Sequence, residues 1–186
     1  CSLLVNEGLS YDPDLVLCFL FLGNDLIRTI EPETSLYIVS FLRYVFKILP
    51  EVEGRKFGKK NYVDTRPTYK PGEFLKLEKK RSRIFNKNWP VFDERCAAAL
   101  DVVTSMKAHC DRRHAEFLMV LIPDEAQVNR ELQQRVVHAW EGLGPEDFDF
   151  RRPNRLLLAK FENRGIAVVD LTEPFAEKSG SRRLYK

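Results

Sequence analysis

Three apolar stretches of the chain are each followed by polar residues that could contact a ligand. These residues are Gly23-Asn24-Asp25 after residues 15–22, Asp124-Glu125 after residues 116–122, and Asp170 with Thr172 at the end of residues 166–171. An asparagine amide can stabilise a developing oxyanion, and carboxylates can contact a metal or a polar ligand. In open α/β sheets, ligands bind where the carboxyl ends of the strands meet. The sequence therefore predicts one polar edge of a sheet as the candidate site.

The apolar stretches themselves predict strands of a parallel sheet. Residues 15–22 are apolar without interruption, a pattern typical of a strand that is covered on both faces. Asp12-Pro13-Asp14 before them predicts a turn, because proline fixes its own φ and keeps the preceding residue out of the α region. Residues 116–122 and 166–171 predict two further buried strands.

Helical repeats separate these strands. Apolar residues recur at helical spacing over residues 91–113, in the helix that Asp124 can cap, and from Pro153 to Gly165. In the second of these helices, the predicted buried stripe consists of Val128, Leu132 and Val136. Residues 1–10 predict the end of a helix that closes at Gly8. Alternation of strand and helix without hairpins predicts an α/β fold, a three-layer α/β/α sandwich with a parallel sheet.

Residues 34–49 predict a further helix, which ends before Pro50. Aromatic residues on its other faces make it unusually apolar, as expected of a core helix or a lid helix. A helix that lies on a membrane surface is the alternative, although only Arg43 and Lys47 supply the basic face that such helices need. The run at residues 15–22 is far shorter than the roughly 18 residues that a membrane span requires.

The turn, the strand and the tripeptide Gly23-Asn24-Asp25 resemble the third sequence block of the SGNH (GDSL-type) hydrolase superfamily. In that block a strand opened by Pro-Asp delivers an asparagine and then an aspartate to the active site. The resemblance implies that the Asn24 amide helps to form the oxyanion hole and that Asp25 shapes the loop. One departure is Leu22, which stands where many members have glycine.

Residues 122–129 carry a second similarity to this superfamily. The strand ends in Ile-Pro-Asp, and the helix after it contains Gln-Val-Asn. The resemblance implies an SGNH hydrolase-like, flavodoxin-like fold and an activity on an acyl ester of a lipid or carbohydrate. The family hydrolyses such esters, or transfers their acyl group, by serine nucleophilic catalysis.

Other parts of the family's catalytic apparatus are not in this sequence. The chain contains no Gly-Asp-Ser segment, which carries the nucleophile in the family, and it ends at Lys186 without an Asp-x-x-His block. His109, His114 and His138 do not follow predicted strands, so we expect structural roles for them. We expect residues 1–186 to be one partial SGNH hydrolase-like domain, inactive alone, with the serine and histidine outside this chain.

Residues 51–90 are a basic segment within this domain. Lysines and arginines are set among glycines and prolines, with few acids and with interleaved aromatic residues. Because the segment follows the candidate site, it predicts an insertion or lid beside that site. An anionic glycan or a lipid headgroup would suit this charge, and polyanion binding through residues 54–87 is an alternative function. We do not expect nucleic acid as the partner.

Cysteine spacing and missing motifs exclude several kinds of site. Cys1, Cys18, Cys96 and Cys110 form no CxxC pair and no zinc-ligand pattern. Cys96 and Cys110 lie ~21 Å apart along one predicted helix, too far for a disulfide. Neither GxGxxG nor a P-loop is present, and we expect no cofactor and no metal.

A non-catalytic Rossmann-like binding module is the alternative from another functional class. In such a module the acids at the strand ends would contact a ligand. The net charge of +3 by itself predicts no acidic partner. No leader is visible from Cys1 onward, and the sequence indicates neither the compartment nor the oligomeric state.

Overall fold

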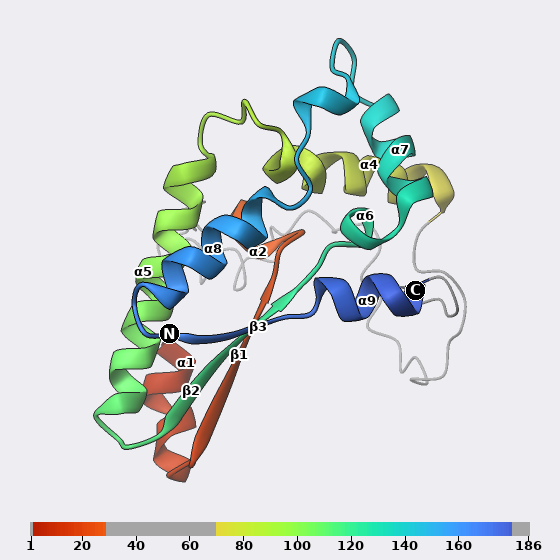
Figure 1. The fold of residues 1–186 in the computed structure, drawn as a ribbon. Coiled ribbons are helices and arrows are strands. Elements are labelled where there is room, and N and C mark those ends of the chain that lie inside the picture. Colours follow the sequence, from red (N-terminus) through yellow and green to blue (C-terminus); the bar gives the residue numbers. More distant parts are fainter. Residues whose placement is uncertain (1, 29–69, 180–186) are drawn as a thin grey trace, which may run out of the picture. The chain divides into compact units, whose positions relative to one another are not determined.

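The computed structural model describes residues 2–28 and 70–179 (Figure 1). The chain divides into two units, and all of these residues belong to the unit made of residues 1–30 and 69–185. The predicted helix over residues 34–49 lies outside the described residues, as does the part of the basic segment before residue 70.

Three parallel strands form the sheet of this unit. They are β1 (Leu15–Phe21), β2 (Glu116–Ile122) and β3 (Ala167–Asp170), in the order β1-β2-β3. Phe21 lies opposite Ile122 at the end of the first pairing, and Leu121 lies opposite Asp170 at the end of the second. The predicted α/β fold with a parallel sheet is confirmed, and the carboxyl ends of all three strands meet at one edge.

Helices pack against one face of this sheet (Figure 1). These helices are α1 (Ser2–Asn6), α5 (Phe92–Asp111) and α8 (Arg152–Glu162). Met119 and Leu121 of β2 are fully buried in a core that also contains Leu100 of α5 and Leu157 of α8. This core fixes the strands and therefore the positions of the residues that follow them.

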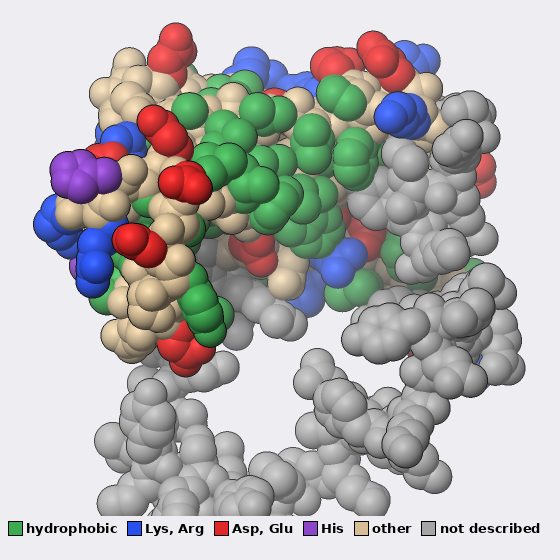
Figure 2. All heavy atoms as spheres, turned by 90° about the horizontal axis from the view of Figure 1, so that it is seen from below, with side chains coloured by type: hydrophobic (Ala, Val, Ile, Leu, Met, Phe, Trp, Pro, Cys, Tyr) green, Lys and Arg blue, Asp and Glu red, His purple; other side chains and the backbone are tan. Residues whose placement is uncertain are grey.

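The opposite face of the sheet carries exposed apolar side chains. Leu15, Leu17 and Phe19 of β1 are 50%, 48% and 57% exposed, and Val169 of β3 is 42% exposed. Figure 2 shows a face of the molecule on which hydrophobic side chains form one continuous area. Within the described structure β1 is therefore packed on one face, and not on both faces as the unbroken apolar run predicted. Its side chains alternate between core and surface, as in a strand with one packed face.

This alternation predicts different effects for the same substitution at two positions of β1. Leu20→Ala truncates a side chain that is 8% exposed, whereas Leu17→Ala truncates one that is 48% exposed. We expect the first to lower the free energy of unfolding by about 2–5 kcal/mol and the second by less than about 1 kcal/mol. Urea unfolding of both variants measures the difference, and equal losses would contradict the observed alternation.

The predicted helical repeats are confirmed, with one interruption. α5 covers most of residues 91–113, and the stripe of Val128, Leu132 and Val136 is buried. That stripe lies on two helices instead of one, α6 (Glu125–Val128) and α7 (Arg130–His138). Asn129 between them is extended, and its side chain accepts a hydrogen bond of 3.1 Å from the backbone N–H of Leu132. An asparagine in this position caps a new helix and so ends the previous one.

Glycine and proline mark some of the helix ends as predicted. Pro153 lies in the first turn of α8, and Gly165, with a φ of +61°, follows the end of that helix. Gly8 does not close α1 in the same way, so that prediction is wrong. Residues 8–11 form the 3₁₀ helix η1 (Gly8–Tyr11), and Asp12 adopts the left-handed conformation with a φ of 52°. Aspartate is among the non-glycine residues that enter this region most readily.

A helix follows β3 directly. α9 (Thr172–Ser179) begins at Thr172 and contains Pro174 in its first turn. Proline is tolerated there because the first backbone N–H groups of a helix have no partner within the helix. Pro174 is therefore compatible with a helix that begins at Thr172.

Residues 70–90, the second half of the predicted basic insertion, belong to the packed unit. They form α4 (Pro71–Arg81) and the 3₁₀ helix η2 (Ser82–Phe85), and Ile84 and Phe85 are fully buried. α4 packs against α7, and Asn86 forms an isolated antiparallel bridge with Phe148. This half of the segment therefore differs from a solvated lid and brings charged side chains into the interior.

Candidate functional site

The polar residues that follow the three strands lie along one edge of the sheet. Asn24 comes three residues after β1, Asp124 two residues after β2, and Asp170 is the last residue of β3. Because the pairings keep the strand ends level, the parallel register places these residues on the same side of the sheet. The edge that the sequence predicted as the candidate site is thus formed by the predicted strands.

Backbone and side-chain hydrogen bonds hold the turn that carries Asn24. The Asn24 N–H donates to the carbonyl of Phe21 at 3.2 Å, and the Asn24 carbonyl accepts from the N–H of Ile27 at 3.1 Å. Asp25 begins α2 (Asp25–Arg28), and its carboxylate accepts a hydrogen bond of 2.8 Å from the Phe21 N–H. Arg95 of α5 donates to the Ile27 carbonyl at 2.7 Å. The turn is therefore tied both to β1 and to a helix of the core.

The side chain of Asn24 is available to a ligand. The residue is partly exposed, and its side chain has no hydrogen-bond partner among residues 2–28 and 70–179. The carboxylate of Asp25, in contrast, is engaged with the backbone of β1. An unpaired amide on a fixed turn can donate a hydrogen bond to an oxygen that gains negative charge.

Gly23 allows the close approach between the ends of β1 and β2. A Cβ atom on Gly23 would lie 2.0 Å from Oδ2 of Asp124 and 2.9 Å from Cζ of Phe21. No other residue type fits there without moving one of these groups. Leu22, the departure from the family pattern, is fully buried and anchors the turn in the core.

Asp124 combines a structural role with burial of its charge. Its side chain accepts a hydrogen bond of 3.0 Å from the Ala126 N–H, and Gln127 accepts one of 2.9 Å from the Asp124 N–H. These two bonds form a capping box at the start of α6, as expected of an Asp-x-x-Gln sequence. The side chain of Asp124 is fully buried, and burial raises the pKa of its carboxyl group.

A second buried carboxyl group faces Asp124 from α4. Glu78 is fully buried next to the charge of Asp124, and Arg81 donates to Glu78 Oε1 at 2.6 Å. Burial, together with the charge of Asp124, raises the pKa of Glu78 to about 8. The Arg81 guanidinium also lies 5.3 Å from the centre of the Phe21 ring. α4 thus contacts the same turn region from the other side.

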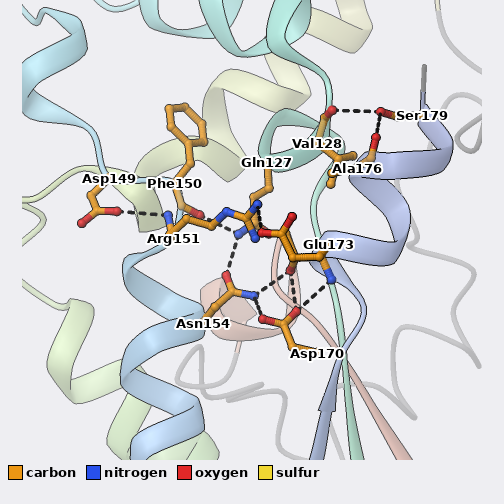
Figure 3. A network of polar contacts seen from close by, with 11 residues as sticks. Gln127, Val128, Asp149, Phe150, Arg151, Asn154, Asp170, Glu173, Ala176 and Ser179 are labelled. Atoms are coloured by element: carbon orange, nitrogen blue, oxygen red, sulfur yellow. Dashed lines mark hydrogen bonds and ion pairs between the residues drawn. The ribbon is translucent and has the colours of Figure 1, made fainter.

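A hydrogen-bonded network connects the end of β3 to α6 and α8 (Figure 3). Nδ2 of Asn154 donates to Asp170 and to the hydroxyl of Thr172, at 2.8 Å in each case. Nε2 of Gln127 donates to Oδ1 of Asn154 at 2.7 Å and to the Phe150 carbonyl at 2.6 Å. The side chains of this network form hydrogen bonds with one another. The network therefore holds the edge of the sheet together, and these polar atoms are already paired.

The three histidines lie away from the strand ends. His109 is half-buried and contacts Arg112, and His114 lies just before β2, next to the amino ends of the strands. His138 is exposed at the end of α7 and contacts the Gln134 carbonyl. The Ser179 hydroxyl contacts the carbonyls of Val128 and Ala176, and no histidine or other base. Ser179 is therefore not paired with a histidine.

Sequence reasoning missed four residues of this region. Glu78 and Arg81 lie in the basic segment, and the sequence predicts no role for Gln127 or Asn154 at the strand ends. A signal existed for Gln127, since it stands three residues after the capping Asp124. No local pattern indicates that Glu78 meets Asp124, because their contact depends on the packing of α4 against the end of β2.

The buried acidic pair predicts a decrease in stability between pH 5.5 and 8.5. Because the pKa of Glu78 is about 8 in the folded chain and 4.5 is its ordinary value, the folded state binds more protons than the unfolded state across this range. The free energy of unfolding should therefore fall as pH rises, by up to about 1.4 kcal/mol per pH unit. Urea unfolding at several pH values measures the slope. Glu78→Gln should flatten it, and a slope that persists in this variant would contradict the assignment.

The described residues show neither reactive thiols nor a metal cluster. Cys18, Cys96 and Cys110 are free, and burial raises the pKa of Cys96 to about 12, so that its thiol stays protonated. No group of three or more His, Cys, Asp and Glu residues in this part of the chain could hold a metal ion. No helix over residues 2–28 and 70–179 is long and apolar enough to cross a membrane.

Comparisons with known proteins identify no relative of this chain. No protein-family model matches it, and neither the curated proteins nor the solved structures contain a match.

Proposed function

We propose that this chain is part of an SGNH-type hydrolase that acts on an acyl ester of a lipid or a carbohydrate. In this proposal Asn24 is a donor of the oxyanion hole, and Asp25 shapes the loop that carries it. The observation that supports it best is the unpaired, partly exposed Asn24 side chain at the carboxyl edge of a parallel sheet. The sequence contains no Gly-Asp-Ser, so the nucleophilic serine and the histidine base are proposed to come from polypeptide beyond these 186 residues.

The proposed reaction is acyl transfer to a serine and then to water. The serine oxygen attacks the ester carbonyl carbon while the histidine takes its proton, and the carbonyl oxygen becomes negatively charged. Nδ2–H of Asn24 donates a hydrogen bond to this oxygen, which stabilises the transition state more than the neutral ester. Collapse of the intermediate expels the alcohol, and water then releases the acid by the same steps. Transfer to another alcohol in place of water would make the protein an acyltransferase.

The order of the strands supports the α/β/α sandwich that this proposal includes. In the described part β1 is an edge strand, and one sheet face carries exposed apolar residues. Parallel sheets are normally covered on both faces. We therefore propose a flavodoxin-like α/β/α sandwich in which further polypeptide pairs with β1 and covers Leu15, Leu17 and Phe19. The serine would arrive with that polypeptide.

Hydrolysis of p-nitrophenyl acetate, with labelling by a fluorophosphonate, tests the proposal. Fluorophosphonates react with activated serines. We expect no turnover and no labelling for residues 1–186 alone, and both for a longer polypeptide that includes this chain, with the label outside residues 1–186. A longer polypeptide that neither hydrolyses esters nor takes up the label would contradict the proposal. Turnover by the 186 residues that is lost on replacing one of their own serines would contradict the assignment of the nucleophile.

A further inference from the structure

Two carboxyl groups lie buried against the turn that carries Asn24, and the proposed reaction does not use them. Glu78 and Asp124 are both fully buried, and they come from α4 and from the residues after β2. Isolated carboxylates are very costly to bury, and two of them repel each other. The pair therefore needs a specific arrangement of protons and partners.

The hydrogen-bonding atoms indicate where a proton lies. Oε1 of Glu78 accepts from Arg81, and Oδ1 of Asp124 accepts from the Ala126 N–H. The second oxygen of each group, Glu78 Oε2 and Asp124 Oδ2, is buried and has no donor. Because the two groups act directly on each other, one proton shared between these two oxygens would satisfy both.

Glu78 is the member of the pair that holds this proton. Burial raises the pKa of both carboxyl groups, but the backbone N–H of Ala126 opposes this rise at Asp124, whereas the charge of Asp124 adds to it at Glu78. Arg81 is the cation that faces the pair, and its guanidinium also lies over the Phe21 ring. Among the described residues, Arg81 is the cation that acts on both members of the pair.

The shared proton is connected to Asn24 through Gly23. Oδ2 of Asp124, the atom that receives the proton from Glu78, also lies against Gly23 at a distance that leaves no room for a Cβ atom. A shift of the Asp124 carboxyl group toward Gly23 would therefore displace the residue directly before Asn24, and a shift away would remove the contact that confines this residue. Phe21 links the same turn to Arg81. The N–H of Phe21 donates to Asp25 and its carbonyl accepts from Asn24, while the Phe21 ring contacts the Arg81 guanidinium.

We propose that Glu78 is a positioning residue that donates a hydrogen bond to Asp124, holds Asp124 against Gly23 and so fixes the orientation of the Asn24 amide. Loss of the proton leaves two buried carboxylates that repel each other, and the turn is released. The consequence for catalysis rests on the proposed hydrolase function, whereas the effect on the turn does not.

Nuclear magnetic resonance of the labelled 186-residue chain between pH 5.5 and 9.5 tests the positioning role. We expect the signals of the Asn24 side-chain amide and of the Gly23 N–H to shift with a common midpoint near pH 8. Glu78→Gln, which donates to Asp124 at every pH, should keep these signals at their low-pH positions. Glu73→Gln is the matched control, because Glu73 is an exposed acid of the same helix, and it should leave the transition unchanged.

Two outcomes would overturn the inference: signals of Asn24 that do not change over this range, or a transition that persists in Glu78→Gln. If Glu78→Gln does not fold, the carboxyl carbon shift of Glu78 in the unsubstituted chain decides, since a shift typical of an ionised group at pH 7 also overturns it.

Ester turnover by the longer polypeptide separates this inference from the proposed function. We expect kcat to fall at least tenfold as pH rises through the same midpoint, and Glu78→Gln to abolish that fall. If the Asn24 signals follow Glu78 but no ester is hydrolysed at any pH, the positioning role stands and the hydrolase proposal fails. If turnover depends on Asn24 but the signals do not change with pH, the hydrolase proposal stands and the positioning role fails.

Discussion

Replacing Asn24 with alanine is expected to lower kcat for acyl-ester hydrolysis by about 10²–10³ in a longer polypeptide that contains this chain. The substitution removes a side-chain donor that has no other partner in the described structure. The backbone bonds from Asn24 to Phe21 and Ile27 do not involve the side chain and remain. The free energy of unfolding should therefore change by less than about 1 kcal/mol. Steady-state kinetics with p-nitrophenyl acetate and urea unfolding measure the two quantities.

Asn163→Ala is the matched control for this prediction. Asn163 is an exposed asparagine that follows α8, at the opposite end of β3 from the polar edge. We expect its substitution to leave kcat unchanged. A kcat for Asn24→Ala within threefold of the unsubstituted value would exclude Asn24 from the oxyanion hole. A loss of activity that accompanies unfolding of the variant would assign it a structural role instead.

Gly23→Ala is expected to destabilise the fold strongly. The new methyl group would lie 2.0 Å from Asp124 Oδ2, and Asp124 is buried and holds the start of α6. Relief of this overlap must break the capping bond, the contact with Glu78, or the turn itself. We expect the free energy of unfolding to fall by about 2–4 kcal/mol, as for an overpacked core site that also loses a helix cap. Urea unfolding measures this loss.

Gly72→Ala provides the control for Gly23→Ala. A Cβ atom on Gly72, in the first turn of α4, would meet no other atom within 4 Å. Alanine is favoured over glycine in helices, so we expect no loss and a gain of up to about 1 kcal/mol. In a double-mutant cycle, Asp124→Ala should make Gly23→Ala much less costly, because the clashing side chain is absent. Additive losses in that cycle would show that the clash is not with Asp124.

The strands and most helices of the described unit could be predicted from local patterns. Strong signals came from the apolar runs of β1, β2 and β3 and from the apolar repeat of α5. In each case the apolar positions recur as expected for the strand or helix that buries them. The exposure of one face of β1 was not predictable in this way. An unbroken apolar run is equally apolar on both faces, so its sequence does not tell which face is packed against the described core.

Some residues of the site could be predicted from the neighbouring sequence, whereas others are brought there only by tertiary packing. Asn24 and Asp25 follow a strong strand signal, and the capping role of Asp124 could be expected from its place before a helix. The contact of Glu78 with Asp124 was not predictable, since it joins residues far apart in the sequence. Its neighbours in the sequence are lysines and arginines, which indicated an exposed segment. The helical period of α4 alone places Glu78 on the same face as Ser82, and only tertiary packing shows that this face is buried.

A crystal structure of the fluorophosphonate adduct of a longer polypeptide tests the proposed role of Asn24 most directly. The phosphonyl group on the serine imitates the tetrahedral intermediate, with its oxygen at the place of the oxyanion. An Asn24 oxyanion donor requires Nδ2 of Asn24 at about 2.7–3.1 Å from that oxygen, on the same edge of the sheet as Asp124 and Asp170. An adduct whose oxygen is held by other donors, with the Asn24 amide directed away from it, would contradict the proposed function.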